Sequence, residues 1–261
     1  MIADGLAYLS NDENWVKKLL VGGGILAASG FIGGALWFLI ITYFVSFLIA
    51  FPVGGYYIRV MRATVRGEDN PPSFDNWGNL FKDGALAFVI SAIYLFVPAV
   101  LSFISFFLFV FATASFTPTP EVEQSAEEIA NTVAGLSIGA FVTFFLAFFL
   151  WLVLSYFLTI GLVNFAKEEE FGAAFSLNTF REVGFSPKFV LSWIVGFAGL
   201  GMVATGIQFI FRLVVMPIPG DVAGLVIFGA FSLLIMPFVT FYITVSSNRI
   251  MAKGFAKAID S

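Results

Sequence analysis

The chain has 261 residues, of which 59% are hydrophobic and 11% are charged, with a formal net charge of −4. Soluble domains are about 45–50% apolar and about 25% charged, so this composition predicts an integral membrane protein. The chain has no Cys and no His, which excludes disulfides, thiolate nucleophiles, imidazole bases and the usual zinc sites, and its acidic balance argues against nucleic acid as a partner.

Residues 1–18 are suited to a short amphipathic helix that lies on the membrane surface. Ile2, Leu6 and Leu9 fall on one helical face because they recur at spacings of four and three residues. No basic region precedes the apolar run, so we expect this stretch to be retained instead of cleaved as a signal peptide. Trp15 is expected to anchor its end at the headgroups.

Residues 19–58 form a hydrophobic segment that is too long for one upright span. Its forty residues would make about 60 Å of helix, which is roughly twice the hydrocarbon thickness of about 30 Å. The segment either folds back near residues 30–34 as a hairpin or crosses once and continues along the interface. The chain then has six spans or, as the alternative, five.

A cytoplasmic loop over residues 59–83 contains most of the longest polar passage, GEDNPPSFDNWGNLFKDG. The passage has no Walker pattern, so a phosphate cradle of that type is excluded. Phe74, Trp77 and Phe81 share one face at spacings of three and four residues. These aromatic residues predict a short interfacial helix that is anchored at headgroup depth.

The same passage is rich in carboxylates. Glu68, Asp69, Asp75 and Asp83 could together collect a cation, but a solvated polar loop explains them with fewer assumptions. We therefore expect no metal site and no cofactor.

The remaining apolar runs predict two more hairpins. These comprise residues 84–166 and 189–247, with a cytoplasmic loop at 167–188 and a cytoplasmic tail at 248–261. Phe180 is expected to anchor a third interfacial helix over residues 173–183. Arg212 and Asp221 flank the tight turn PIPG in the last hairpin, where they could form an ion pair.

The positive-inside rule favours six spans. Twelve of the thirteen Lys and Arg residues fall in the N-terminal segment, the two cytoplasmic loops and the C-terminal tail. The loop over residues 117–128 has four Glu and no basic residue, which places it on the opposite side. Six spans put all twelve basic residues, and both chain termini, on the cytoplasmic side of the cell membrane.

Three short stretches then resemble a known family. They are GYYIRVMR from Gly55, GED from Gly67 and PSFDNWGNLFKDG from Pro72. This pattern is similar to that of a mainly archaeal family of multi-pass membrane proteins catalogued as domain of unknown function 4013 (DUF4013). The resemblance implies a fold and a membrane location, and it attributes no catalytic residues.

The sequence therefore predicts an all-α, polytopic transmembrane helix bundle, with short interfacial helices, in a single domain over residues 1–261. We expect a non-enzymatic scaffold or accessory component that binds membrane lipids and either another membrane protein or a second copy of itself. The alternative is a permease or lipid-handling transporter with an uncharged cavity near Pro98 and Pro237, two prolines expected to kink their helices. A membrane enzyme is disfavoured because only loop carboxylates such as Glu68 and Asp69 could carry acid and base chemistry.

Overall fold

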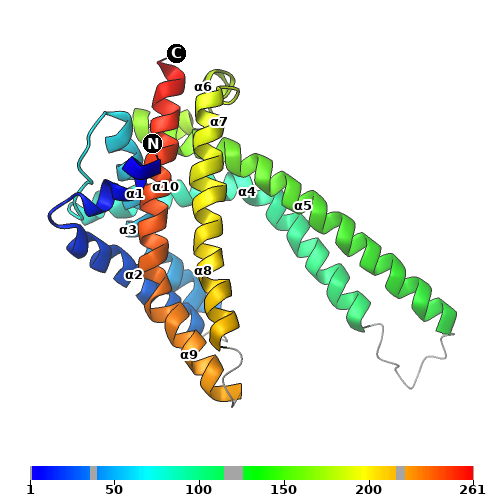
Figure 1. The fold of residues 1–261 in the computed structure, drawn as a ribbon. Coiled ribbons are helices and arrows are strands. Elements are labelled where there is room, and N and C mark those ends of the chain that lie inside the picture. Colours follow the sequence, from blue (N-terminus) through cyan, green and yellow to red (C-terminus); the bar gives the residue numbers. More distant parts are fainter. Residues whose placement is uncertain (1, 36–39, 115–125, 216–220, 261) are drawn as a thin grey trace. The chain divides into compact units, whose positions relative to one another are not determined.

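The computed structural model describes residues 2–35, 40–114, 126–215 and 221–260, and all the secondary structure it describes there is helical (Figure 1). The elements are α1 (Ile2–Ser10), α2 (Trp15–Ala35), α3 (Ile40–Val65), α4 (Trp77–Ala114), α5 (Ala126–Glu168), the 3₁₀ helix η1 (Phe171–Phe175), α6 (Leu177–Val183), α7 (Pro187–Trp193), the π-helix η2 (Ile194–Gly199), α8 (Leu200–Val215), α9 (Asp221–Leu234) and α10 (Met236–Ile259). The all-α fold class is confirmed.

Six helical segments in the described part of the chain are long and apolar enough to cross a membrane. They are Trp15–Gly34, Phe44–Val65, Trp77–Ala114, Glu127–Glu168, Pro187–Val215 and Val226–Ile259. The chain is thus a multi-pass membrane protein. It divides into two compact units, unit 1 (residues 1–90 and 159–261) and unit 2 (residues 91–158).

The long first hydrophobic segment, predicted as one or two spans, forms two helices that pack against each other. The hydroxyl of Ser29 in α2 donates to the backbone oxygen of Ser46 in α3 at 2.8 Å. At the other end of the pair, Trp15 and Leu19 of α2 pack on the core cluster to which Tyr56 of α3 belongs. The two helices are therefore antiparallel, which makes the hairpin and agrees with six spans instead of five.

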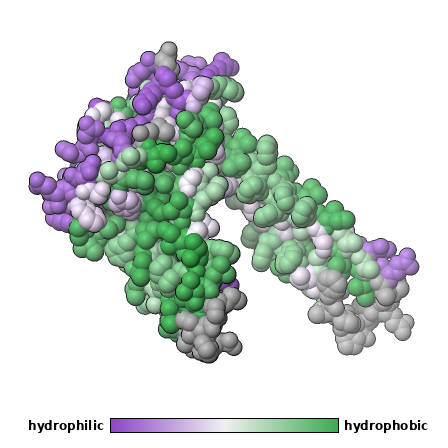
Figure 2. Space-filling model, in the orientation of Figure 1, coloured by the Kyte–Doolittle hydropathy of each residue, from purple (hydrophilic) through white to green (hydrophobic). Residues whose placement is uncertain are grey.

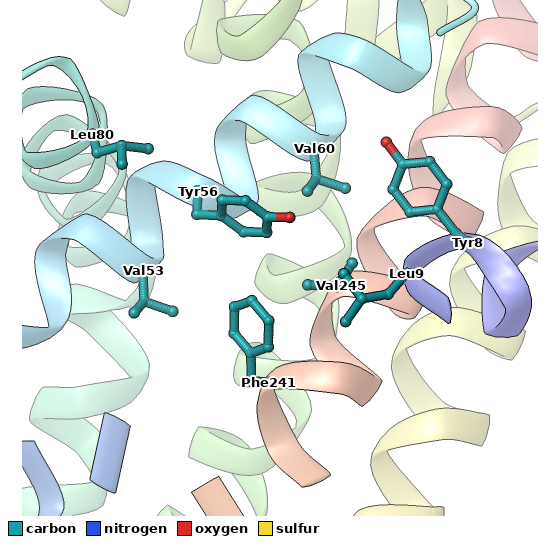
Figure 3. Close-up of a cluster of buried hydrophobic side chains, with 8 residues drawn as sticks. All are labelled: Tyr8, Leu9, Val53, Tyr56, Val60, Leu80, Phe241 and Val245. Carbon is teal, nitrogen blue, oxygen red and sulfur yellow. The ribbon is translucent and has the colours of Figure 1, made fainter. Parts of the chain in front are cut away.

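The core of unit 1 joins four helices near one end. Figure 3 shows its buried side chains: Tyr8 and Leu9 of α1, Val53, Tyr56 and Val60 of α3, Leu80 of α4, and Phe241 and Val245 of α10. Burial of apolar side chains contributes about 1.5–3 kcal/mol each relative to exposure, so this cluster holds α1 firmly on the spans. The predicted surface helix over residues 1–18 is a shorter element that packs on the protein, and Leu9 faces this core.

The first helix ends early because of a local turn. Asp12 accepts the backbone N–H of Asn14 on its side chain at 2.7 Å, and its backbone oxygen accepts that of Trp15. Such Asx turns compete with helix continuation. The chain restarts as α2 at Trp15, so the two lysines that follow belong to the first turn of a span.

The loop predicted over residues 59–83 is shorter in the structure, since α3 continues to Val65 and α4 begins at Trp77. A Schellman motif ends α3: Glu68 N–H bonds to Ala63 O, Gly67 N–H bonds to Thr64 O, and Gly67 has a φ of +79°. The arginines near the end of α3 remain helical because partners from other elements neutralise them, as described below.

Most of residues 248–261, predicted as a tail, belong to the last helix. α10 continues to Ile259, and its residues from Val245 to Phe255 are mostly buried in unit 1. Pro237, expected inside a helix, instead follows a break at Ile235 and occupies the first turn of α10, where a proline costs no hydrogen bond. Pro98 does lie inside α4.

Unit 2 consists of the C-terminal part of α4 and the N-terminal part of α5. Small buried residues line their contact, where the Ser105 hydroxyl donates to the backbone oxygen of Ala140 at 2.7 Å. Phenylalanines such as Phe103 and Phe149 are exposed on the outer faces. This pattern matches the packing of membrane helices, which approach each other through small residues and direct large apolar side chains to lipid.

Hydrophilic residues gather at one end of unit 1, whereas hydrophobic residues cover the length of its helices (Figure 2). Both chain termini lie at this end (Figure 1). We call it the charged end; it comprises α1, the start of α2, the C-terminal part of α3, the 66–76 loop, the start of α4, the end of α5, η1, α6 and the C-terminal part of α10.

Candidate functional site

The charged end is organised around Arg249 of α10, whose side chain is only 1% exposed. Its Nη1 donates to the backbone oxygen of Glu68 at 2.5 Å and to the hydroxyl of Thr64 at 3.2 Å, and its Nη2 donates to Asp69 at 2.9 Å. The guanidinium carbon lies 4.3 Å from the ring centroid of Tyr8. One buried cation thus joins α1, α3, the 66–76 loop and α10.

A second contact holds α1 against α10. Lys253 donates to the carboxylate of Asp4 at 2.7 Å, and Nε of Arg249 lies 4.0 Å from the same carboxylate. Burial alone would raise the pKa of Asp4, but the hydrogen bond from Lys253 and the charges of Lys253 and Arg249 lower it below its ordinary value. Burial raises the pKa of Tyr8 to about 12, so its ring stays neutral beneath the guanidinium.

Three arginines follow one face of α3 at spacings of three and four residues, and each has an acidic partner from another segment. Arg59 bonds to Asp75 at 2.5 Å, Arg62 lies 3.2 Å from Asp83, and Arg66 bonds to Glu169 at 2.5 Å. Arg62 also donates to the backbone oxygen of Ala166 at 3.1 Å and approaches Glu169 at 3.5 Å. These contacts tie α3 to α4 and to the end of α5.

Two hollows share Arg59 and Arg62 of this row in their linings. The first has a volume of about 160 Å³ and is lined by Arg59, Arg62, Asn79, Lys82, Asp83, Leu86, Phe165 and Glu169. The second, of about 310 Å³, is lined by Arg59, Arg62, Ala63, Arg66, Glu68, Pro72, Ser73 and Asp75. Both lie in unit 1, and both have walls formed largely by charged side chains.

The carboxylates of the polar passage do not converge on a common point. Asp69, Asp75 and Asp83 each face a different arginine, and Glu68 contributes its backbone oxygen. The hydrogen bonds from Ser73 and Arg59 lower the pKa of Asp75, which keeps this exposed carboxylate ionised. Within the described ranges, no group of three or more acidic residues is placed to hold a metal ion.

The predicted interfacial anchors divide into two groups. Trp77 and Phe81 are exposed on the first turns of α4, as an anchor at the headgroups requires. Phe74 lies before the helix and stacks on Tyr56, with ring centroids 4.1 Å apart and planes 2° apart. Trp15 likewise packs on the core cluster. These two rings therefore hold the protein's own segments together.

Phe180 of α6 is also only half-buried, and its neighbours Leu177 and Phe185 are the exposed apolar residues of this surface segment. Asn164, near the end of α5, positions the segment by donating to the backbone oxygen of Ala173 at 2.8 Å and to the hydroxyl of Thr179 at 3.2 Å. A buried polar residue in a span thus holds a surface helix.

The ion pair predicted between Arg212 and Asp221 lies partly outside the described residues, because the side chain of Asp221 is among those not described. The guanidinium carbon of Arg212 lies 6.0 Å from the ring centroid of Phe228 in α9. This contact places Arg212 beside the next helix.

Sequence reasoning missed Arg249 and Tyr8, which meet at the centre of the charged end. Arg249 stood in the predicted tail, and Tyr8 stood between the apolar positions of the first helix. The available signal was the apolar pair Met251 and Phe255, whose spacing of four residues extends the last helix beyond the end of its hydrophobic run.

Comparison with known protein families identifies a match. The profile of the family described as "Protein of unknown function (DUF4013)" matches residues 38–216. No curated protein and no solved structure matches. The match covers more than half of the chain, including the row of arginines and the polar passage, and the chain therefore belongs to this family.

Proposed function

We propose that this DUF4013 protein is a non-enzymatic scaffold or accessory component of the membrane, which binds lipids and either another membrane protein or a second copy of itself. The observation that carries the proposal is that the charged side chains of the charged end bind other parts of the protein. The buried Arg249 and the arginine row are committed to contacts that fix surface segments on the spans. A rigid charged surface above apolar helices is suited to binding instead of turnover.

The location and orientation proposed are the cell membrane, with both chain termini cytoplasmic. Lys18, Arg59, Arg62, Arg249 and Lys253 come from separate parts of the chain and make contacts within the same charged end. The positive-inside rule then favours this end as the cytoplasmic one.

Reconstitution of the purified full chain into liposomes tests the scaffold proposal. We expect solute flux and scrambling of a fluorescent lipid to equal those of protein-free vesicles, while gramicidin-containing vesicles report that the flux assay works. Flux or scrambling in proportion to the amount of protein would overturn the proposal.

One observation favours the alternative, a permease or lipid-handling transporter. The fifth span contains the π-helix η2, and the sixth breaks at Ile235. The two spans meet where the hydroxyl of Ser247 donates to the backbone oxygen of Gly196 at 2.7 Å. Irregular helices of this kind form binding sites in many transporters. Protein-dependent flux that is lost in Ser247→Ala would support this alternative.

A further inference from the structure

The smaller hollow has the volume and the lining of a site for a polyatomic anion. A cavity needs only about 10–15 Å³ to hold one water, so a volume of about 160 Å³ accommodates a larger group. Arg59, Arg62 and Lys82 contribute three positive charges to its walls, against the two carboxylates of Asp83 and Glu169.

The two carboxylates are already occupied. Arg62 lies 3.2 Å from Asp83 and 3.5 Å from Glu169, and Arg66 also binds Glu169. Their negative charge is therefore compensated before any ligand enters. The positive charge of Arg59 is likewise compensated by Asp75, so Lys82 supplies the excess positive charge of the hollow.

Arg59 and Lys82 retain hydrogen-bonding capacity. All three hydrogen bonds of Arg59 leave from Nη1, so its Nη2 and Nε have no partner among the described residues. Lys82 is exposed and forms no ion pair with any residue in the part of the chain that the structure describes. Arginine and lysine in this state are the usual ligands of phosphate oxygens.

The hollow also lies where polar surface gives way to apolar surface. Leu86 is one turn beyond Lys82 on α4 and lines the hollow, and Val89 continues the same face and is exposed. Trp77 and Phe81, exposed on the preceding turns, are suited to headgroup depth. A ligand with an anionic head and apolar tails matches a charged hollow that is followed by an apolar surface.

We propose that the hollow lined by Arg59, Arg62 and Lys82 binds the phosphate group of an anionic phospholipid, whose acyl chains leave along Leu86 and Val89. The inference rests on the lipid-binding part of the proposed function and gives it a site. Basic pockets at the membrane surface bind anionic headgroups in this way.

Native mass spectrometry of the full chain in neutral detergent, titrated with phosphatidylglycerol, tests the site. Lys82→Glu is expected to weaken binding of the first lipid by about tenfold or more, because it reverses a charge in the hollow. Lys17→Glu is the matched control, since Lys17 is exposed near the same end and the change in net charge is identical. Its affinity should remain that of the wild type.

Equal losses in both variants would show that only overall charge matters and would overturn the site, as would unchanged affinity in Lys82→Glu. Lys82→Gln, with its melting temperature measured alongside, separates loss of binding from loss of fold. A well-folded Lys82→Gln that keeps wild-type affinity would also overturn the site.

A second titration identifies the source of the phosphate. Inorganic phosphate is expected to compete only at millimolar concentration, and phosphatidylcholine to bind more weakly than phosphatidylglycerol. Micromolar binding of inorganic phosphate, without preference between the two lipids, would overturn the lipid assignment. Failure of the site or of the lipid assignment would leave the liposome flux result unchanged. The inference and the scaffold proposal can therefore fail separately.

Discussion

Gly55 of α3 and Gly84 of α4 lie where the two helices cross with their backbones in contact. A Cβ on Gly55 would overlap the backbone oxygen of Leu80, and one on Gly84 would overlap that of Phe51 and lie 2.9 Å from the nitrogen of Gly55. Only glycine permits this approach. Because Asp83 precedes Gly84 directly, the crossing also places its carboxylate beside Arg62 and forms one wall of the smaller hollow.

Gly84→Ala is therefore expected to destabilise the protein by about 1–3 kcal/mol, since the helices must separate to admit a methyl group. The melting temperature in detergent should fall. The matched control is Gly78→Ala in the first turn of the same helix, where an added Cβ meets nothing within 4 Å. There the melting temperature should stay the same or rise slightly, because alanine favours helix. Equal effects at both positions would refute the close crossing.

The spans could be predicted from the sequence, because an uncharged run of twenty residues or more has few alternatives to a transmembrane helix. The crossing of α3 and α4 could not, since one sequence does not show which glycines touch a partner. Gly34 and Gly135, which belong to GxxxG patterns, have nothing within 4 Å of an added Cβ. Gly55 and Gly84 belong to no such pattern, and among the glycines of the described residues they make the closest approaches to another backbone.

The residue composition of the charged end was predictable from the sequence, but the ion pairs between its residues were not. The basic residues of the loops and tail were expected to share one side, and their contacts lie at one end of unit 1. The contact between Arg249 and Asp69 joins residues 180 positions apart and leaves no local signal in the sequence. Helix ends were also misplaced, because charged residues that gain partners remain helical in the fold, as Arg62 does in α3.

Arg249→Ala should detach α1 and the 66–76 loop from the spans. The substitution removes a buried cation together with its hydrogen bonds, and we expect a loss of roughly 3 kcal/mol. Hydrogen exchange measured by mass spectrometry should rise in residues 2–10 and 66–76.

Lys257→Ala is the control for this change, since Lys257 is exposed on the same helix and its backbone, not its side chain, accepts a bond from Lys188. Exchange in residues 2–10 should then stay at the wild-type level. Wild-type exchange in Arg249→Ala would contradict the central role of this residue.

The contact between Asp4 and Lys253 makes the stability of α1 packing dependent on pH. Although burial of Asp4 opposes ionisation, Lys253 and Arg249 lower its pKa below the ordinary value of 3.8. A carboxylate whose pKa falls on folding stabilises the fold above its unfolded pKa, and this contribution is lost as the pH falls through the folded value. The wild type should therefore melt higher than Asp4→Asn at pH 5 to 7, by a constant margin. The margin should begin to shrink as the pH falls below about 3.8 and vanish once the pH lies below the folded pKa.

Lys253→Met provides the control for this measurement, because it removes the group that does most to lower the pKa of Asp4. In that background Asp4→Asn should have a much smaller effect at pH 7. An effect of undiminished size would mean that another group stabilises the carboxylate.

The orientation of the spans can be tested directly because the chain has no cysteine of its own. Three single replacements, Asn11→Cys, Glu127→Cys and Asp260→Cys, report on the turn after α1, the start of α5 and the C-terminal end, and all three positions are exposed. With six spans and both termini cytoplasmic, a membrane-impermeant maleimide should label only Glu127→Cys in intact cells and all three after permeabilisation. The cysteine-free parent should stay unlabelled. Labelling of Asn11→Cys but not of Asp260→Cys in intact cells would indicate five spans. Labelling of both, without labelling of Glu127→Cys, would indicate the inverted orientation. The charged end would then face outward, against the positive-inside rule.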